Sequence, residues 1–357
     1  MRKTVILETH NIKNPHTGFG VFNQGLINGL SHHDHSNLDL LLLSYKPADL
    51  KAKFGKAFKY KKIYSFNRYK NFSVNKKHDL WHSVNQNLKF EPKKVSKYLL
   101  TVHDVNFAEG TTREDTTSKR KKIFIDKLTR STAITYISQF AKEQAHRYFT
   151  IPNVPEYIVY NGNPIISIAD TSHYQPTVSV EKPYLYSIGD FLQKKNFTAI
   201  IAMMKHIPDF NLIISGDYNK PYGEEVKKSI EDNRLTDRVF LTGKVSDTGK
   251  QYFMQNCTAF LFPSVGEGFG LPPIEAMKFG KPVFLANRTS LPEIGGEHAF
   301  YWDDFDGEYM ASEFYKGMNT YSSDPGFYSE KYTERANYFN WDKTAREYLD
   351  IYNSILQ

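Results

Sequence analysis

The sequence predicts an α/β protein with two Rossmann-like, doubly wound parallel sheets that face a common cleft. Short apolar runs alternate with amphipathic segments along most of the 357 residues, as expected where helices cover both faces of a parallel sheet. A polar segment with several prolines interrupts this alternation near the middle of the chain, and the strand–helix pattern then starts again. Because a chain of this length commonly folds as two domains, we interpret the interruption as a linker.

The N-terminal domain is expected to span residues 1–165. Its strand candidates are short apolar runs at 4–7, 38–43, 79–82, 98–102, 133–137 and 157–159. Helical spacing of apolar residues occurs between several of these runs, at 21–30, 119–130 and 140–148. This alternation predicts parallel strands joined by crossover helices.

After a linker at 166–183, the same alternation predicts a C-terminal domain over 184–338. Its strand candidates lie at 184–188, 211–214, 239–241, 259–262 and 282–285. Its helical patterns lie at 197–206, 224–233, 248–255 and 273–279. Folds of this class bind ligands beyond the carboxyl ends of their strands, which is where chemically active residues are expected.

Composition restricts the class of protein. A formal net charge of +7 favours anionic partners such as nucleotide phosphates, phospholipid head groups, anionic glycans or nucleic acid. The single cysteine, Cys257, excludes an internal disulfide and fits a reducing compartment. The apolar part of the N-terminus is too short for a secretory signal, and no apolar run approaches the roughly 20 residues that span a bilayer. We therefore expect a cytoplasmic protein without transmembrane helices.

The run at 259–262 leads into the most informative segment, which reads FPSVGEGFGLPPIEAM. Its glycines predict a loop, and its two prolines suit the first turn of a helix, where a missing N–H group costs little. The N–H groups of such a turn carry a partial positive charge that favours a diphosphate. Glu267 lies on the loop and Glu275 in the expected first helical turn, and carboxylates accept paired sugar hydroxyls well. A glycine-rich turn with a capping glutamate is the alternative interpretation.

This segment resembles the signature of the family-4 retaining glycosyltransferases of the GT-B fold, in which seven residues separate two glutamates. Other parts of the C-terminal half are similar to motifs of the same family: Gly189 with Lys195 and Asn196 ("G…KN"), 240–245 ("flGxv"), 280–283 ("GxPV") and 291–294 ("lpEv"). The end of the chain, 339–357, resembles the family's closing helix, which packs back across the domains. The resemblance covers nearly all of the C-terminal half and is weaker in the N-terminal half.

The resemblance implies a role for several of these residues. Glu275 would hold the ribose hydroxyls of a nucleotide, Glu267 a hydroxyl of the donor sugar, and Lys195 the diphosphate leaving group. The backbone amides expected to meet the diphosphate or the sugar are those of Phe269, Gly270 and Leu271. Many family members have an arginine where this chain has Asp190, so one phosphate-binding cation is absent from that position.

The N-terminal half offers two weaker signals. Gly18 and Gly20 follow the first expected strand, but Asn23 occupies the third glycine position of a dinucleotide-binding fingerprint. The two glycines instead resemble the family's glycine-rich first loop, where backbone approaches the sugar or phosphate; an ordinary strand–helix turn is the alternative. His103, within the sequence TVHD, resembles a family histidine that would contact the transferred sugar or the acceptor. A lone histidine at a strand end more often serves only as a hydrogen-bonding group.

Other positions carry lesser expectations. His82 ends another strand candidate and is an acceptor-side candidate, and Ser138 is expected to cap a helix. The sequence Asp304-Phe305-Asp306 resembles a metal-binding Asp-x-Asp motif, but it lies in an expected surface loop. No cysteine–histidine cluster has the spacing of a zinc site. We therefore expect no metal.

A basic, aromatic stretch spans residues 46–77, with Asp49 as its one acidic residue. Leu50, Phe54 and Phe58 have the i, i+4 spacing of one helix face. Cations with aromatic anchors suit an anionic membrane surface, so we expect peripheral contact with the inner face of the membrane. A solvated charged face is the alternative. Nucleic acid is not expected, because the sequence has no nucleic-acid-binding motif.

Together these features predict a retaining, metal-independent hexosyltransferase that needs no cofactor. It would move mannose, glucose or N-acetylglucosamine from a nucleotide-diphosphate sugar to a hydroxyl of a glycan or glycolipid, in the synthesis of cell-surface polysaccharide or lipopolysaccharide. The stereochemistry follows from the resemblance alone. Two alternatives stay open: a nucleotide-sugar epimerase of the same architecture, and a non-catalytic nucleotide-sugar-binding protein.

Overall fold

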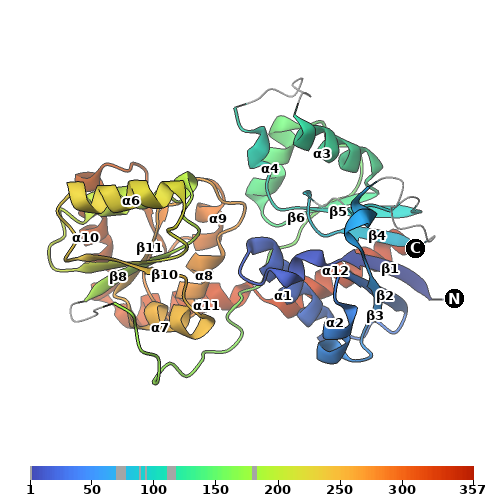
Figure 1. Ribbon diagram of the computed structural model, residues 1–357, viewed down its shortest axis with the longest axis horizontal. Coiled ribbons are helices and arrows are strands. Elements are labelled where there is room, and N and C mark those ends of the chain that lie inside the picture. Colours follow the sequence, from blue (N-terminus) through green and yellow to red (C-terminus); the bar gives the residue numbers. More distant parts are fainter. Residues whose placement is uncertain (1, 70–77, 88–89, 93–94, 111–117, 179–182) are drawn as a thin grey trace. The chain divides into compact units, whose positions relative to one another are not determined.

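The computed structural model of the chain describes residues 2–69, 78–87, 90–92, 95–110, 118–178 and 183–357. Its contacts divide the chain into two compact units. Unit 1 consists of Met1–Gly162 together with Asn340–Gln357, and unit 2 consists of Asn163–Phe339. The chain therefore leaves unit 1, forms unit 2 and returns to unit 1 for its last residues (Figure 1).

Unit 1 contains a parallel sheet whose strand order, over the residues described, is β3-β2-β1-β4-β5-β6-β7. The strands are β1 (Lys3–Glu8), β2 (Leu38–Ser44), β3 (Lys59–Lys62), β4 (Leu80–Ser83), β5 (Lys97–Val102), β6 (Ala133–Tyr136) and β7 (Glu156–Ile158). Each neighbouring pair is parallel. Val5, Ile6 and Leu7 on the central strand β1 are all fully buried, as in a sheet that is covered on both faces.

The helices of unit 1 connect these strands, except α12, which is the last element of the chain. Those in the described residues are η1 (His10–Lys13), α1 (Gly18–His32), α2 (Pro47–Phe54), η2 (Ser65–Arg68), η4 (Asn106–Ala108), α3 (Lys119–Arg130), α4 (Gln139–Tyr148) and α12 (Trp341–Leu356). The expected cap of α4 is confirmed, because Ser138 Oγ accepts a hydrogen bond from the Ala141 N–H at 3.0 Å.

Unit 2 is built on a second parallel sheet, with the order β10-β9-β8-β11-β12-β13 in its described part. Its strands are β8 (Tyr184–Ile188), β9 (Asn211–Ser215), β10 (Val239–Gly243), β11 (Ala259–Phe262), β12 (Val283–Ala286) and β13 (Phe300–Trp302). Its helices are η5 (Gln193–Lys195), α5 (Phe197–Met203), α6 (Pro221–Asp232), α7 (Asp247–Asn256), α8 (Leu271–Met277), α9 (Leu291–Gly295), α10 (Gly307–Ser323) and α11 (Pro325–Tyr338). Figure 1 shows α6 and α7 on opposite faces of this sheet, which is the doubly wound arrangement that the sequence predicts.

Each run that the sequence marks as a strand overlaps a strand of the structure. The sequence does not indicate β3, an edge strand of basic and aromatic residues, or the short strand β13. The sequence predicts one helix that carries Leu50, Phe54 and Phe58 on one face, and the length of this prediction is wrong. α2 ends at Phe54, because Gly55 follows with a φ of +58° that breaks the helix. Phe58 is nevertheless 5% exposed, immediately before β3.

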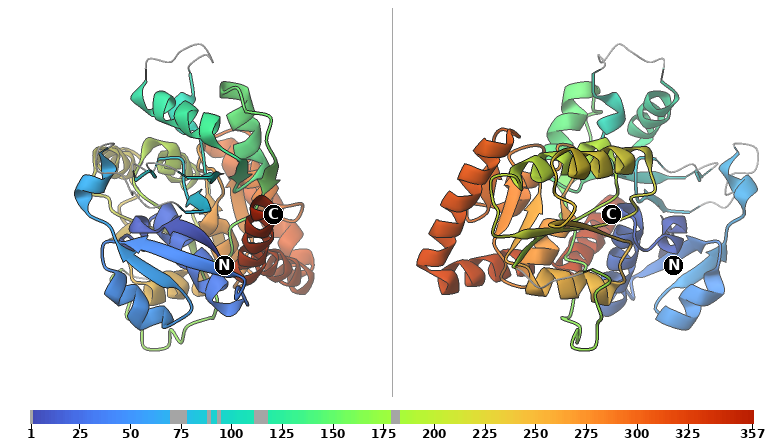
Figure 2. Two further views of the ribbon diagram at one scale, coloured as in Figure 1. Left: turned by 90° about the vertical axis from the view of Figure 1, so that its right-hand side faces the viewer. Right: turned by 60° about the vertical axis from the view of Figure 1, so that its left-hand side comes forward.

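The last helix, α12, packs on α1 through close contacts that only glycine allows. A Cβ at Gly25 would lie 2.1 Å from the Trp341 ring, and one at Gly29 would lie 2.4 Å from the Trp341 carbonyl oxygen. Gly162 is equally constrained, since a Cβ there would lie 2.4 Å from the Trp341 nitrogen. The C-terminal helix, dark red in Figure 2, is therefore part of the packing of unit 1.

His82 is a buried structural residue, which corrects its expected role on the acceptor side. Its Nδ1 shares a hydrogen bond with Tyr352 Oη at 2.7 Å, and its Nε2 shares one with Thr101 Oγ1 at 2.8 Å. Thr101 also contacts Thr135 Oγ1 at 2.7 Å and Tyr348 Oη at 3.0 Å. These side chains tie α12 to β4, β5 and β6. Burial lowers the pKa of His82 to about 3, so its ring is neutral in the folded state.

We predict that His82 makes the chain less stable in mild acid. Its pKa is about 3 in the folded state, whereas an exposed histidine ring has a pKa of 6.5, so the unfolded state binds the extra proton and stability falls as the pH drops below 6.5. The loss is at most about 1.4 kcal/mol per pH unit. His82→Gln, which keeps a hydrogen-bonding side chain but cannot titrate, should show a shallower decline in the free energy of unfolding. Urea denaturation between about pH 7 and pH 4 measures both slopes, and equal slopes would contradict this account.

Candidate functional site

The glycine-rich loop of unit 2 begins at the carboxyl end of the buried strand β11. Gly270 ends the loop with a φ of +116°, a conformation that favours glycine, and a Cβ there would lie 2.9 Å from Leu291 Cδ2. α8 follows, with its two prolines in the first turn. Glu275 therefore lies in the second turn of α8, not in the first turn as expected, and is 5% exposed.

Glu267 is held in the loop by a short ion pair and a hydroxyl group. Lys195 Nζ lies 2.5 Å from Glu267 Oε1, and Ser264 Oγ donates a hydrogen bond to the same oxygen at 2.6 Å. Lys194 Nζ donates to the Gly266 carbonyl at 2.9 Å, which brings a second ammonium to the loop. Burial alone would raise the pKa of the Glu267 carboxyl group. The ammonium groups of Lys195 and Lys194 lower this pKa by more than burial raises it, so it lies below its ordinary value. Glu267 is thus an ionised and oriented hydrogen-bond acceptor.

The backbone of this loop is fastened from two sides. Ser290 Oγ, at the start of α9, hydrogen-bonds the carbonyl oxygens of Glu267 and Phe269 at 3.1 and 2.7 Å. From the other side, the Lys194 carbonyl oxygen lies 3.0 Å from Ser264 Oγ, whose one hydroxyl hydrogen can be donated either to this oxygen or to Glu267. Phe269 itself is 4% exposed. The position of the Glu267 carboxylate is therefore fixed before any ligand binds, which is the arrangement that precise recognition requires.

Glu275 has a partner of its own on α7. Lys250 Nζ lies 2.5 Å from Glu275 Oε1 and 3.9 Å from Asp247 Oδ1. Only 6% of the Glu275 side chain and 18% of the Lys250 side chain are exposed. Burial alone would lower the pKa of the Lys250 ammonium. The Glu275 carboxylate raises this pKa by more than burial lowers it, so it lies above its ordinary value. The structure thus contains a buried ion pair that the sequence motifs do not reveal.

The turn that supplies Lys195 contains a further ion pair. Asp190 Oδ1 lies 3.1 Å from Lys220 Nζ, at the start of α6. Both side chains are partly exposed, Lys220 by 30% and Asp190 by 60%. A cation is therefore present beside Asp190, although the chain has no arginine at that position.

In unit 1, His103 directly follows β5 and is 5% exposed. Its Nε2–H donates to the Val84 carbonyl at 2.9 Å, and its backbone N–H donates to Gln86 Oε1 at 3.1 Å. The ring packs edge-on against Phe19 and Phe22 of α1, with centroids 4.9 and 4.7 Å away. Burial lowers the pKa of His103 to about 4, so the ring is neutral, and this tautomer leaves Nδ1 as a hydrogen-bond acceptor. His103 is suited to accept a hydrogen bond from a hydroxyl group.

Gly18 and Gly20 lie in the first turn of α1, where Thr17 is the N-cap. A Cβ at Gly20 would lie 1.8 Å from the Asn14 carbonyl oxygen, so the packing of the preceding turn is enough to require this glycine. A Cβ at Gly18 would meet no described atom within 4 Å. Of the two, Gly18 is the position with open space beside it.

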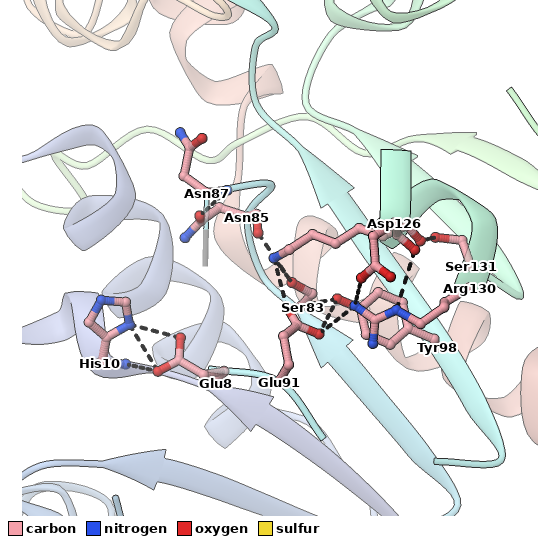
Figure 3. A network of polar contacts seen from close by, with 11 residues as sticks. Glu8, His10, Ser83, Asn85, Asn87, Glu91, Tyr98, Asp126, Arg130 and Ser131 are labelled. Atoms are coloured by element: carbon pink, nitrogen blue, oxygen red, sulfur yellow. Dashed lines mark hydrogen bonds and ion pairs between the residues drawn. The ribbon is translucent and has the colours of Figure 1, made fainter. Parts of the chain in front are cut away.

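A buried polar network lies at the carboxyl ends of β1 and β4 in unit 1 (Figure 3). Glu8, fully buried at the end of β1, accepts hydrogen bonds from Nδ1 and from the backbone N–H of His10, both at 2.9 Å. Lys127 Nζ lies 2.9 Å from Glu91 Oε1 and 3.2 Å from Ser83 Oγ. Burial lowers the pKa of Lys127, and Glu91 restores it only in part. Sequence reasoning missed this network, although Glu8 directly follows a predicted strand.

Asp306, the second aspartate of the Asp-x-Asp sequence, has a structural role. Asp306 Oδ1 accepts hydrogen bonds from the N–H groups of Glu308 and Tyr309 at 3.0 Å, and so caps α10. Within the described residues, no group of three or more histidine, cysteine or acidic side chains is placed to hold a metal ion. None of the helices that the structure describes combines the length and the apolar character needed to cross a bilayer.

Residues 170–311 match the sequence model of the family described as glycosyl transferases group 1. The serotype-specific mannosyltransferase WbdA of Escherichia coli is 26% identical over 263 residues, which cover 66% of this chain and 31% of WbdA. This chain therefore spans about a third of the length of WbdA. The O-antigen chain mannosyltransferase B of Escherichia coli is 24% identical over 284 residues, which cover 73% of this chain and 71% of that protein.

Solved structures of other proteins have the same fold over nearly the whole chain. A glycosyltransferase from Rickettsia africae has a TM-score of 0.71 at 16% identity, with 100% of this chain and 99% of that chain covered. HepE from Anabaena, solved in complex with UDP and glucose, has a TM-score of 0.71 at 14% identity, with 99% of this chain and 100% of that chain covered.

The fold is therefore that of the GT-B glycosyltransferases, with two parallel Rossmann-like sheets. The family match and the mannosyltransferase relatives support a group 1 glycosyltransferase. The matched region contains Glu267, Glu275 and the lysines that pair with them, Lys195 and Lys250.

Proposed function

We propose that this chain transfers a hexosyl unit from a nucleotide-diphosphate sugar to a hydroxyl of a glycan or glycolipid, with retention at the anomeric carbon. The observation that carries the proposal is the pairing of Glu267 with Lys195 and of Glu275 with Lys250 in one loop–helix segment. A carboxylate that a cation keeps ionised is a strong acceptor for sugar hydroxyls. Mannose is the first candidate for the transferred sugar, because the relatives described above are named mannosyltransferases.

In this proposal the two carboxylates bind different parts of the donor. Glu275 accepts the hydroxyls of the nucleoside ribose, and Glu267 accepts a hydroxyl of the sugar. The Lys195 ammonium, 2.5 Å from Glu267 in the free protein, shares its charge with the diphosphate as the bond to the sugar breaks. Additional donors to the diphosphate or the sugar are the backbone amides of Phe269, Gly270 and Leu271.

The transfer step needs no enzymic nucleophile. The acceptor oxygen forms its bond to the anomeric carbon on the face from which the diphosphate leaves, and a departing phosphate oxygen takes the acceptor's proton. His103, which is neutral because burial lowers its pKa to about 4, accepts a hydrogen bond from a hydroxyl of the transferred sugar or of the acceptor. Gly18, with open space beside it, lets the backbone approach the same ligand.

We also propose that the acceptor is part of a growing cell-surface polysaccharide or lipopolysaccharide. This follows the names of relatives such as the O-antigen chain mannosyltransferase B and the lipopolysaccharide core biosynthesis mannosyltransferase LpsB of Rhizobium meliloti. Acceptors of this kind are commonly attached to lipid, so a surface that binds the cytoplasmic face of the membrane would bring the enzyme to them.

The described part of the basic stretch has the features of such a surface. Tyr64, Phe66 and Tyr69 are 47%, 49% and 56% exposed. The Lys62 ammonium lies 5.1 Å from the centre of the Tyr64 ring, and the Arg68 guanidinium lies 5.2 Å from that of Tyr69. Cations beside exposed aromatic rings favour a peripheral position on an anionic bilayer. The rest of the stretch, residues 70–77, lies outside the described residues.

We predict that Glu275→Ala weakens the affinity for the nucleotide by about tenfold or more, because the ribose hydroxyls lose a charged acceptor. Glu267→Ala should lower turnover more than nucleotide affinity. Isothermal titration with UDP and GDP, together with turnover of a panel of nucleotide sugars, measures both effects. Glu224→Ala is the control, since it removes an exposed carboxylate that pairs with Lys227. Unchanged nucleotide affinity in Glu275→Ala, or unchanged turnover in Glu267→Ala, would remove that residue from the site.

Activity should survive removal of divalent cations. Lys195 and the loop amides are proposed to stabilise the charge of the leaving group, so that no Mg²⁺ or Mn²⁺ is required. Turnover measured after dialysis against EDTA should equal turnover before it. Loss of activity that is restored by adding a divalent cation would overturn the metal-independent mechanism.

The protein should sediment with vesicles that contain phosphatidylglycerol and remain in solution with vesicles of phosphatidylcholine alone. Phe66→Ser should reduce this binding, whereas Phe327→Ser, which alters an exposed aromatic residue of unit 2, should not. Equal binding to both kinds of vesicle, or binding to neither, would refute the proposed membrane surface.

A further inference from the structure

The ion pair between Lys250 and Glu275 is more buried than a surface salt bridge. The Glu275 side chain is 6% exposed and the Lys250 side chain 18%, and their charged atoms lie 2.5 Å apart. By comparison, the pair of Lys316 with Glu313 on α10 has exposures of 69% and 31%. A buried pair of this kind adds little net stability, yet loss of one partner leaves the other as an uncompensated charge. Net stability therefore does not account for the presence of Lys250.

The geometry leaves Glu275 able to bind a ligand while it is paired. An ionised carboxylate has about four lone-pair sites, and the Lys250 contact is to Oε1. One lysine thus fixes the rotation of the carboxylate and leaves sites for two hydroxyl donors. A protonated carboxyl group would lose this capacity, because one of its oxygens becomes a donor.

We propose that Lys250 is a positioning residue for the nucleotide: its ammonium holds the Glu275 carboxylate aimed to accept both hydroxyls of the ribose. The proposal rests on the proposed function, in which Glu275 binds the nucleotide. It adds a residue of α7 that belongs to no motif in the sequence.

The other charged groups near the pair do not replace Lys250. On α7, Asp247 Oδ1 lies 3.9 Å from Lys250 Nζ and is acidic itself. Tyr186 on β8 interacts electrostatically with Glu275, but burial raises the pKa of this phenol far above neutrality. β11 and β12, which pack against α8, have only apolar side chains.

Cations on the helices next to α8 are engaged elsewhere. Arg335 on α11 donates to the backbone carbonyls of Ile294 and Glu293 of α9. Lys331 on α11 pairs with Glu334, and Lys278, which caps α8, donates to Asn337. Glu293 on α9 is acidic and therefore cannot replace the Lys250 ammonium. Removal of Lys250 therefore leaves the Glu275 carboxylate without its ammonium partner and without the contact that fixes its orientation.

The test measures the affinity of the full chain for UDP and GDP between about pH 6 and pH 8.5 by isothermal titration. Lys250→Met should bind the preferred nucleotide about tenfold more weakly than the unaltered protein, because the Glu275 carboxylate loses the contact that fixes its orientation. Lys250→Arg should bind like the unaltered protein across the range, because it retains the cation. Titration of the nucleotide phosphate is common to all variants and cancels in the ratio of affinities.

Lys316→Met is the matched control, since it removes an exposed ion pair of the same unit. It should bind nucleotide like the unaltered protein. Circular dichroism and thermal unfolding show whether each variant is folded, and Lys250→Gln is measured in the same way if Lys250→Met does not fold. A Lys250 variant without the cation that binds as tightly as the unaltered protein, or a Lys250→Arg variant that binds as weakly as Lys250→Met, would overturn the positioning role.

The outcome also separates this inference from the function on which it rests. If the unaltered chain binds neither UDP nor GDP, the nucleotide site itself is refuted, and the role of Lys250 is refuted with it. If the unaltered chain binds one of them and Glu275→Ala weakens that binding, the site stands, and the affinities of the Lys250 variants alone decide the role of the lysine.

Discussion

Two acidic side chains in unit 2 have little access to water, and a lysine from another element reaches each of them. Taking a carboxylate out of water costs several kcal/mol unless a cation and hydrogen bonds accompany it. Lys195, from the turn before α5, meets Glu267 on the loop, and Lys250, from α7, meets Glu275 on α8. The turn, the loop and the two helices must therefore pack together in one arrangement. The same contacts that hold these elements produce a set of oriented acceptors for hydroxyl groups.

Unit 1 follows the same rule with different groups. Several of its buried polar side chains are paired with one another, as in the chain from His82 to Tyr352 and the pair of Lys127 with Glu91. The contacts of His82 join the last helix to the central strands, so the C-terminal residues are needed to complete this unit. His103 differs from His82 in its partners, since its Nε2–H meets a backbone carbonyl and its Nδ1 remains an acceptor in that tautomer. This difference between two buried histidines separates a structural role from a proposed role in binding.

Much of the fold could be predicted from the sequence, because fully buried parallel strands leave apolar runs that local patterns detect. β3 was missed for the opposite reason: an edge strand of lysine and tyrosine has no apolar run. The signature around Glu267 and Glu275 marked the candidate site, but it placed Glu275 in the first turn of the helix instead of the second, since the start of α8 depends on Gly270 and its contact with Leu291. Lys250 could not be found, because its meeting with Glu275 is a tertiary contact between residues 25 positions apart.

The central claim is that Glu267 and Glu275 bind an activated sugar through its hydroxyl groups. A crystal structure of the chain with a nucleotide-diphosphate sugar, chosen as the one that binds most tightly, tests this claim most directly. The account predicts that the ribose hydroxyls lie within hydrogen-bond distance of the Glu275 carboxylate and that a sugar hydroxyl lies within hydrogen-bond distance of Glu267. A nucleotide sugar bound elsewhere, with both carboxylates still engaged only by their lysines, would contradict it.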